Sequence, residues 1–321
     1  MPSLPTFTFT TTAGEVASVF TDQIRGKNVF VTGPTINGLG YETARVLSQH
    51  ANLVIIAGYN LERLKLAESA VKSEFPAANI RPLVLDLASF ASIRAAAAQV
   101  TEPLHVLIHN AAAPGGDLRL SEDHFEMHLA VDHIGPFLLT KLLAPNLLAA
   151  ETATYTPRVV FVSSIAHAQA GVDLAMVTPH PDPARYHVYG AYGQAKTANI
   201  LTARELSRRA MGRINAYSLH PGTVFTNAQL REAVKEHMMI LGILGTDGLP
   251  NKEKFEWKTL AQGAATTVAA AFDTRLDDTP GAYLVDCVVA DDHLSLHATD
   301  PAMAEKLWAL TEEVIGERFV F

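Results

Sequence analysis

The chain has 321 residues, of which 48% are hydrophobic and 18% are charged, and its formal net charge is −8 at pH 7. This composition is typical of a globular protein, and the length allows one large α/β domain or two small ones. Without a basic stripe, the chain is a poor nucleic-acid partner, since phosphate binding needs clustered Lys and Arg. Cys287 is the single cysteine, which excludes an internal disulfide and a cysteine-built metal site.

The first 26 residues are expected to form an N-terminal extension with a helix near 12–25 that ends at Gly26. This stretch has neither a basic segment nor a continuous apolar run, so we expect no signal peptide. No window reaches the roughly 18–20 apolar residues that a membrane helix needs. A cytoplasmic protein without a membrane span is the expectation.

Short apolar runs alternate with longer helical patterns along the rest of the chain. Val, Ile and Leu fill the short runs without polar alternation, as in strands that are covered on both faces. The pattern predicts a single doubly wound (Rossmann) α/β domain over 1–321, with a seven-stranded parallel sheet and helices on both faces. The expected strands are 28–33, 52–58, 80–87, 104–111, 158–164, 213–220 and 282–290.

A glycine-rich turn follows the first expected strand, with Gly33, Gly38 and Gly40 ahead of an amphipathic helix. Glycines let the backbone turn sharply and approach a phosphate, and the helix N-terminus favours that anion. A tight strand–helix turn without a ligand is the alternative.

A hydroxyl and a Tyr–Lys pair stand after the fifth strand. Ser163 and Ser164 end a buried parallel strand, where a hydroxyl faces the crevice and can polarise a substrate carbonyl. Tyr192 stands one helical turn before Lys196, so the two side chains can share a face. A free tyrosine has a pKa around 10, and a neighbouring cation favours its phenolate, so the pair can act as an acid/base. Surface decoration is the alternative.

The residues 223–258 interrupt the alternation and are rich in Met, Ile, Leu and Gly. They are expected to form an apolar helical lid over the crevice, because ligands bind beyond the carboxyl ends of parallel strands. An ordinary helical insertion packed on the sheet is the alternative.

Together these motifs resemble the short-chain dehydrogenase/reductase family. TGPTINGLG is similar to the family pattern TGxxxGxG with one extra residue, which Asn37 could absorb in a left-handed conformation. HNAA (109–112), YxxxK and HPG (220–222) follow in the family's order. The pieces GYETARVL, GPFLLTKLL, SSIAH and AYGQAKTANILTAREL are most similar to the retinol-dehydrogenase-like and WW-domain-oxidoreductase-like branch.

The resemblance implies NAD(P)-dependent interconversion of a carbonyl and an alcohol on a small or lipophilic substrate. Tyr192 would be the acid/base, Lys196 would stabilise its phenolate and hold the nicotinamide ribose, and Ser164 would polarise the carbonyl. Ser163 would turn to the sheet or bond to backbone. The implied cofactor-binding residues are Gly33, Thr35, Asn37, Gly38, Leu39, Gly40, Tyr59, Asn60, Arg63, Asp86, Leu87, Asn110, Ala111, Tyr192, Lys196, Pro221, Gly222, Val224 and Thr226.

The choice of dinucleotide depends on the end of the second strand. An acid there would accept the ribose hydroxyls of NAD, whereas an Arg would pair with the 2′-phosphate of NADP. The sequence offers Gly58, Tyr59 and Asn60 with Arg63 one turn on, so we expect NADP, and NAD stays open.

Asp132 replaces the Asn that the family usually has in its catalytic set. Since Pro136 has no N–H, the carbonyl of Asp132 loses its helical partner and would be available to the family's proton relay. The carboxylate, if it lay near Lys196, would raise the lysine pKa and weaken its pull on Tyr192. We therefore include Asp132 among the catalytic residues.

Several other side chains have two interpretations. His124, His128 and His133 are interpreted as a solvated helix face rather than a metal site, so no metal is expected. His167 could touch substrate or support the site from behind. The insertion 171–187 is expected to form a loop at the pocket mouth, with Tyr186 and Tyr189 as pocket or surface aromatics.

A non-catalytic dinucleotide-binding regulator of the same fold is the main alternative function. The longer glycine loop, His109 and Asp132 would then mark erosion of an active site. A sugar-nucleotide epimerase or dehydratase is a third hypothesis, against which no second nucleotide site is apparent. Substrate identity, direction and oligomeric state stay open, since relatives occur as monomers, dimers and tetramers.

Overall fold

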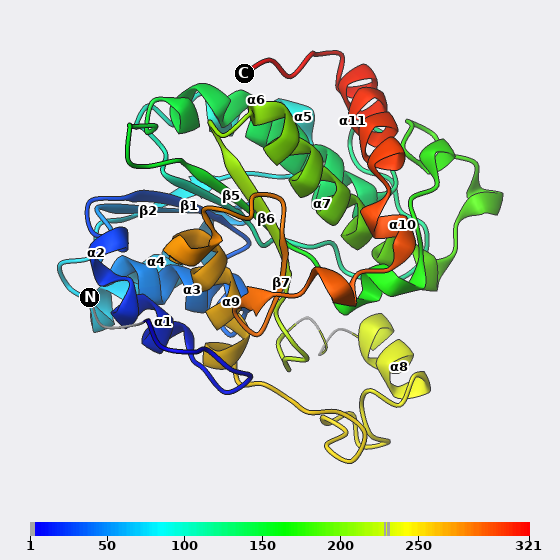
Figure 1. Cartoon of the computed structure of the whole chain (residues 1–321). Helices are drawn as coiled ribbons and strands as arrows, with labels where there is room; N and C mark the ends of the chain where they lie inside the picture. The colour runs from blue at the N-terminus through cyan, green and yellow to red at the C-terminus, as the bar shows by residue number, and fades with distance from the viewer. Residues whose placement is uncertain (1–3, 228, 230–231) are drawn as a thin grey trace.

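The computed structural model describes residues 4–227, 229 and 232–321. At its centre is one sheet with the strand order β3-β2-β1-β4-β5-β6-β7-β8 (Figure 1). The strands β1 to β7 pair in parallel, as predicted. Their bounds are β1 (Asn28–Thr32), β2 (Leu53–Gly58), β3 (Ile80–Val84), β4 (Val106–His109), β5 (Arg158–Val162), β6 (Asn215–His220) and β7 (Tyr283–Val285).

The predicted count of seven strands is wrong by one. The run 282–290 is a hairpin of β7 and the antiparallel β8 (Val288–Val289) rather than a single strand. Asp286 and Cys287 form the turn with φ of 51° and 68°. Two residues with positive φ are the backbone signature of the tight turn that suits a two-residue hairpin.

Helices cover both faces of the sheet, and alternate residues of each strand point to opposite cores. Phe30, Ile55 and Phe161 pack with the helices of one face, and Val31, Ile56 and Val160 pack with those of the other. The first face carries α5 (Phe90–Ala97), α6 (Gly135–Leu148), α7 (Val188–Ala210) and α11 (Pro301–Ile315). The second carries α1 (Ala13–Val19), α3 (Leu39–Ser48), α4 (Leu61–Glu74) and α9 (Leu260–Phe272).

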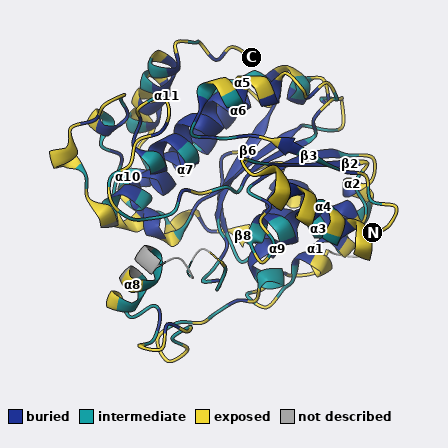
Figure 2. Cartoon of the chain, turned by 180° about the vertical axis from the view of Figure 1, so that it is seen from behind, coloured by how far each residue is buried: buried dark blue, intermediate teal, exposed yellow. Residues whose placement is uncertain are grey.

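The central strands β1, β2, β4, β5 and β6 are buried between these layers, whereas β8 is exposed, and exposed residues gather on outer helix faces and loops (Figure 2). The remaining helices are short. They are α2 (Thr21–Ile24), α8 (Glu232–Ile240), α10 (Leu296–Thr299), the π-helix η1 (Leu129–Ile134), and the 3₁₀ helices η2 (Ile165–Gln169), η3 (Leu174–Met176), η4 (Pro183–Arg185), η5 (Thr274–Leu276) and η6 (Asp291–His293).

The strand order reverses between β1 and β4, and this sets the place of the crevice. Ligands of doubly wound sheets bind outside the carboxyl ends of the strands at this point. The loops that follow β1, β4, β5 and β6 therefore form the candidate site.

The N-terminal extension packs on the second face through α1 and α9. Thr12 caps α1 in a capping box with Glu15, as the expected helix start near residue 12 required. The expected single helix is broken at Phe20, which is buried, and resumes as α2. Gly26, with φ of 77°, follows its end.

The region 223–258 is less helical than predicted. In its described residues, α8 is the helical element, and turns and loops make up the rest. Ile240, Leu241 and Leu249 are exposed. Figure 1 places α8 below the carboxyl ends of β6 and β7. Its role as a lid stays a prediction.

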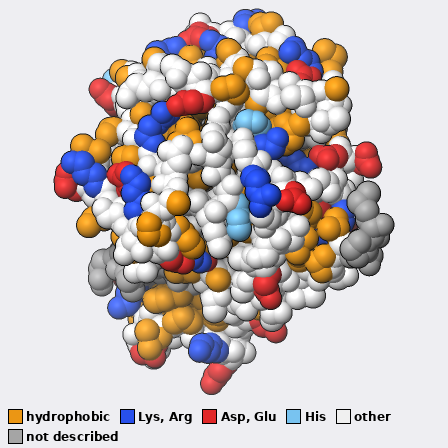
Figure 3. Space-filling view, turned by 90° about the vertical axis from the view of Figure 1, so that its left-hand side faces the viewer, with side chains coloured by type: hydrophobic (Ala, Val, Ile, Leu, Met, Phe, Trp, Pro, Cys, Tyr) orange, Lys and Arg blue, Asp and Glu red, His pale blue; other side chains and the backbone are white. Residues whose placement is uncertain are grey.

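No helix in the described part of the chain has both the length and the hydropathy to span a membrane. On the face shown in Figure 3, Lys and Arg side chains are interspersed with Asp and Glu. This distribution agrees with the absence of a basic stripe in the sequence.

Candidate active site

Helix α7 carries Tyr192 and Lys196 one turn apart. The Lys196 Nζ lies 5.2 Å from the centre of the Tyr192 ring. Lys196 is buried, whereas Tyr192 is only half-buried. The phenol therefore keeps one accessible side, and its cationic neighbour is enclosed by protein.

Two groups hold the Lys196 ammonium. Its Nζ donates to the carbonyl of Val162 at 3.0 Å and lies 3.0 Å from Asp132 Oδ2. The Ser163 hydroxyl donates to the Lys196 carbonyl at 2.8 Å, so Ser163 bonds to backbone as expected. Because an ammonium has three N–H donors, these contacts leave one for a ligand hydroxyl.

Asp132 lies in η1 and is fully enclosed. Its Oδ1 accepts the backbone N–H of Ala113 at 2.7 Å, which links the loop after β4 to α7 through Lys196. Burial acts to lower the pKa of Lys196, but the charges of Asp132 and Tyr192 outweigh it, so this pKa is raised. The contact between Asp132 and Lys196, which the sequence raised only as a condition, is present in the structure. Gly135 donates to the Ala130 carbonyl in the π pattern, and Pro136 offers no N–H to the Asp132 carbonyl.

Ser164 lies in the turn between β5 and η2, beside α7. Its Oγ accepts the N–H of Ala166 at 3.2 Å, which leaves the hydroxyl hydrogen available to donate to a substrate. Gly193, next to Tyr192, lets α7 approach this turn, since a Cβ there would be 2.8 Å from the Ala166 carbonyl oxygen. The fold thus packs the turn of Ser164 against the helix turn of Tyr192.

His167 supports this turn from behind. Its Nε2 accepts the N–H of Ser295 at 3.4 Å, so Nδ1 carries the proton and donates to the Ser164 carbonyl at 2.8 Å. His297 donates to the His167 carbonyl at 2.7 Å. Of the two roles that the sequence left open for His167, the buried supporting one fits these contacts.

The insertion 171–187 reaches the loop after β4. The Tyr186 hydroxyl donates to the Gly116 carbonyl at 2.6 Å, and the N–H of His180 donates to the His124 carbonyl. Asp173 accepts from Arg185 within the insertion. Tyr186 is therefore half-buried between two loops, and the side chain of Tyr189 lies outside the described residues.

The glycine-rich turn is closely packed around the start of α3. A Cβ on Gly33 would be 2.8 Å from Ala111 Cα, and one on Gly40 would be 2.3 Å from Asn110 Nδ2. Gly38 is the N-cap of α3, which begins at Leu39, and as a glycine it offers no capping side chain. Its own N–H donates to the Thr35 carbonyl. The first N–H groups of α3 can therefore bind a phosphate.

The extra residue of this turn is absorbed as expected. Asn37 has φ of 62° and lies in the left-handed region. The Asn227 side chain donates to the Ile36 carbonyl at 2.8 Å, which joins the turn to the loop after β6.

Asn110 ties β4 to β1. Its Nδ2 donates to the carbonyls of Thr32 and Gly33, at 2.9 and 3.2 Å. The N–H groups of Asn110 and Ala111 both donate to Thr32 Oγ1 at 3.0 Å. These contacts assign Asn110 the structural role, which does not exclude a cofactor contact.

The ends of β2 and β3 present the other expected cofactor residues. Tyr59 and Arg63 are exposed, and Asn60 caps α4 by accepting the N–H of Arg63 at 3.0 Å. Asp86 is half-buried and accepts the N–H of Ala88 at 2.9 Å, whereas Leu87 is buried.

The turn after β6 passes close to a buried lysine. Pro221 precedes Gly222, which has φ of 87°, and a Cβ on Gly222 would be 2.7 Å from Lys258 Cδ. Val224 pairs with Lys258 in an isolated bridge. The Thr226 hydroxyl donates to Gln229 Oε1 at 2.7 Å.

Three features of the crevice fit a dinucleotide. The glycine positions leave no room for side chains, the N-terminus of α3 has no side-chain cap, and a lysine N–H remains beside the half-buried phenol.

A family model described as short chain dehydrogenase matches residues 27–177. Short-chain dehydrogenase TIC 32 A, chloroplastic, of Brassica napus is 36% identical over 292 residues, which are 89% of this chain and 87% of that protein. The WW domain-containing oxidoreductase of Danio rerio is 35% identical over 91% of this chain and 69% of its own length. Retinol dehydrogenase 12 of Mus musculus is 33% identical over 92% of this chain and 88% of its own length.

The chain belongs to the short-chain dehydrogenase/reductase family. The expected branch, with retinol dehydrogenases and WW domain-containing oxidoreductases, is confirmed by these relatives. Among solved structures, an uncharacterized protein from Mycobacterium paratuberculosis matches with a TM-score of 0.70 and 29% identity over 93% of this chain and 96% of that one. A short-chain dehydrogenase from Escherichia coli CFT073, complexed with NADPH, has the same fold, with a TM-score of 0.61 and 22% identity over 83% and 98% of the two chains.

The interpretation of the histidine series as a solvated face is wrong for two of its three members. His124 is exposed, but His128 and His133 are buried. His133 lies 2.9 Å from the Thr311 hydroxyl and 3.3 Å from that of Thr202. The described residues hold no cluster of three or more His, Cys, Asp or Glu that could bind a metal.

The sequence also missed Glu126 and His128 as neighbours of the site. His128 Nδ1 lies 2.9 Å from Glu126 Oε1, and both side chains are 2% exposed. The His128 ring stands edge-on to the ring of Tyr192, with centroids 6.1 Å apart. The signal that could have found them is the position of His128, four residues before Asp132.

Two buried histidines of this short-chain dehydrogenase make its stability depend on pH. Burial lowers the pKa of His109 and that of His133 to about 3 from the usual 6.5. The unfolded chain therefore binds more protons than the folded one between about pH 6.5 and 3. The free energy of unfolding decreases as the pH is lowered through this window.

Replacing His133 by Gln is expected to reduce this acid sensitivity, because the amide cannot be protonated there. The measurement is the free energy of unfolding in urea at pH 7 and at pH 4.5. The difference between these values should be smaller in His133→Gln than in the wild type. An unchanged difference would show that His133 is protonated in the folded protein.

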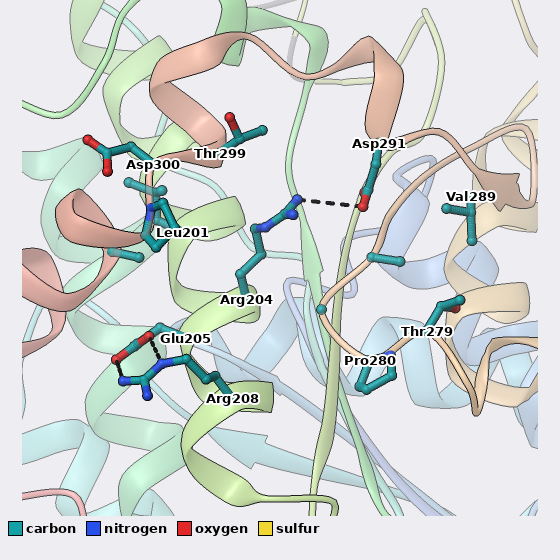
Figure 4. Close-up of a pocket in the computed structure, with 14 residues that line it drawn as sticks. Leu201, Arg204, Glu205, Arg208, Thr279, Pro280, Val289, Asp291, Thr299 and Asp300 are labelled. Atoms are coloured by element: carbon teal, nitrogen blue, oxygen red, sulfur yellow. Dashed lines mark hydrogen bonds and ion pairs between the residues drawn. The ribbon is translucent and has the colours of Figure 1, made fainter.

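A pocket of about 350 Å³ lies more than two turns further along α7 than Tyr192 (Figure 4). In it, Arg204 points across to Asp291, 3.7 Å away, and Glu205 pairs with Arg208. None of the expected site residues lines this pocket. It is therefore separate from the candidate active site.

Proposed function

We propose that this short-chain dehydrogenase is an NADP-dependent oxidoreductase that interconverts a carbonyl and an alcohol on a small or lipophilic substrate. The observation that supports it most is the arrangement of Tyr192. Its phenol is half-buried beside the enclosed Lys196, and the turn of Ser164 packs against the same helix turn. The cytosol stays the expected compartment, and one relative is named chloroplastic.

Each residue of the site has a defined part in carbonyl reduction. When bound, the dinucleotide supplies a hydride to the carbonyl carbon. The Ser164 hydroxyl donates a hydrogen bond to the carbonyl oxygen and polarises the bond. Tyr192 gives its proton to that oxygen, and the charge of Lys196 stabilises the phenolate that remains. The remaining N–H of Lys196 would hold a ribose hydroxyl.

The test is a screen of apolar aldehydes and ketones in which oxidation of NADPH is followed by the absorbance of the reduced nicotinamide. We expect turnover of at least one substrate by the wild type. Binding of NADPH without turnover of any carbonyl would favour the non-catalytic regulator.

The preference for NADP is supported by the missing acid after β2 and by the exposed Arg63. Replacing Tyr59 by Asp should raise KM for NADPH by about tenfold or more, because a carboxylate would repel the 2′-phosphate. KM for NADH should change less or fall.

Tyr59→Asn is the matched control, since Asn has nearly the same shape as Asp but carries no charge. If both variants raise KM for NADPH equally, the loss of the tyrosine ring and not the charge is responsible. If neither variant raises KM for NADPH, the residue after β2 does not contact the 2′-phosphate.

A further inference from the structure

The charged side chains around the proposed acid Tyr192 carry no net positive charge. Lys196 contributes one positive charge, and Asp132, 3.0 Å away, contributes one negative charge. The exposed fractions of the two side chains are 2% and 0%. The family pattern, with Asn in this place, would leave the lysine charge unopposed.

A second buried carboxylate, Glu126, is linked to Tyr192 through the His128 ring. Glu126 Oε1 accepts from His128 at 2.9 Å, and its Oε2 accepts the N–H of Leu129 at 2.9 Å. The same His128 ring stands edge-on to the Tyr192 ring, with centroids 6.1 Å apart. Whichever form His128 takes, the Glu126–His128 pair has a charge of zero or −1.

The titratable side chains that contact Tyr192, or contact those neighbours in turn, come from three segments. Lys196 is on its own helix, and Glu126, His128 and Asp132 are on η1 and the segment before it. Tyr186 is on the insertion. Its pKa is raised to about 12, first by burial and then by Glu126, so it adds no charge near neutral pH.

The cost of a phenolate depends on this balance. Beside a lysine alone, deprotonation of Tyr192 would take the site from +1 to neutral. Beside Lys196 and Asp132 it takes the site from neutral to −1. Charges are poorly screened in an enclosed site, so the difference is larger than it would be in water.

We propose that Asp132, together with the Glu126–His128 pair, keeps Tyr192 in its protonated form at neutral and mildly alkaline pH, which moves the pH range of activity upwards. This inference rests on the proposed function. An enzyme cannot change the equilibrium constant at a given pH. The carboxylates therefore change the pH at which the rates of carbonyl reduction and alcohol oxidation rise or fall. They do not change the ratio of these two rates at a given pH.

The test is the titration of Tyr192 in protein without cofactor. The ring carbons of tyrosine are labelled with ¹³C, and the Tyr192 signal is assigned by its loss in Tyr192→Phe. We expect the midpoint of phenolate formation in Asp132→Asn to lie lower than in the wild type by about one pH unit or more. Glu126→Gln should lower the midpoint in the same direction by less, because His128 intervenes.

The kinetic counterpart uses the wild type and Asp132→Asn with NADPH and a carbonyl from the screen. The variant should keep substantial activity at pH 7, because Asn can still accept from Ala113. Its kcat/KM for reduction should start to fall at a lower pH. Glu305→Gln, which removes a charge from an exposed position on α11, is the matched control and should leave both breaks in place.

The outcomes are distinct. An unchanged midpoint of phenolate formation in Asp132→Asn would overturn the inference. If the Asn variant does not fold, an unchanged midpoint in Glu126→Gln would overturn it. A lowered midpoint in a protein that reduces no carbonyl would keep the charge argument and refute the proposed function instead.

Discussion

Tyr192→Phe is expected to abolish carbonyl reduction, with a loss in kcat of about 10³-fold or more. The ring and its contact with His128 are retained, but the proton donor is gone, and positioned acid–base groups contribute about 10²–10⁴-fold. Affinity for NADPH should stay within about threefold, because the phosphate-binding N–H groups lie in the glycine turn and at the start of α3 and not at the Tyr192 hydroxyl. The measurements are steady-state kinetics and equilibrium binding of NADPH.

Tyr186→Phe is the matched control. Tyr186 also lies near the site, but its hydroxyl donates to the Gly116 carbonyl and has no lysine one turn away. We expect it to change KM more than kcat. If Tyr192→Phe kept most of its kcat, the phenol would not be the acid and the proposed mechanism would be wrong.

Lys196→Met is expected to lose activity and to lower the free energy of unfolding by about 3–5 kcal/mol. Removing one partner of a buried ion pair leaves the other charge without compensation. Here that charge is Asp132, which is fully enclosed and keeps only the N–H of Ala113. The measurement is urea unfolding at pH 7 followed by circular dichroism.

The double variant Lys196→Met/Asp132→Asn separates the two effects. It removes the stranded charge and keeps the acceptor for Ala113, so it should recover at least half of the lost stability without recovering activity. A single variant as stable as the wild type would mean that Asp132 is not charged beside Lys196.

Those parts of the site that depend on local spacing could be predicted from the sequence. Tyr192 and Lys196 are four residues apart on one helix, and the glycines of the first turn are separated by a few residues. The apolar runs also placed the parallel strands, because strands covered on both faces leave little room for polar residues. The left-handed conformation of Asn37 could be proposed from its residue type together with the one extra residue relative to the family pattern.

The sequence did not show whether Asp132 lies near Lys196, because the two residues belong to segments that are far apart in the chain. Its effect on the lysine could therefore be stated only for the case that they are in contact. The burial of His128 and His133 was missed for a physical reason. His124, with φ of 67°, lies before the helix, and η1 is a π-helix, so the α-helical spacing does not describe which face each histidine occupies.

The hairpin β7–β8 was missed because its turn has an unusual composition. Asp286 and Cys287 both have positive φ; Asp is common at the first position of such turns, but the second position usually carries Gly and not Cys. Without that signal, the run 282–290 has the pattern of one continuous strand. The helix content of 223–258 was also overestimated, since α8 is the helical element of its described residues, and Ile240, Leu241 and Leu249 are exposed.

The most direct test of the account is the fate of the hydride. The protein is incubated with NADPH that carries deuterium on the transferred position of C4 and with a carbonyl from the screen, and the product is examined by mass spectrometry and NMR. We predict an alcohol with deuterium on the former carbonyl carbon, formed by the wild type and not by Tyr192→Phe. Deuterium retained in the cofactor across the whole screen, or equal transfer by the Phe variant, would contradict it.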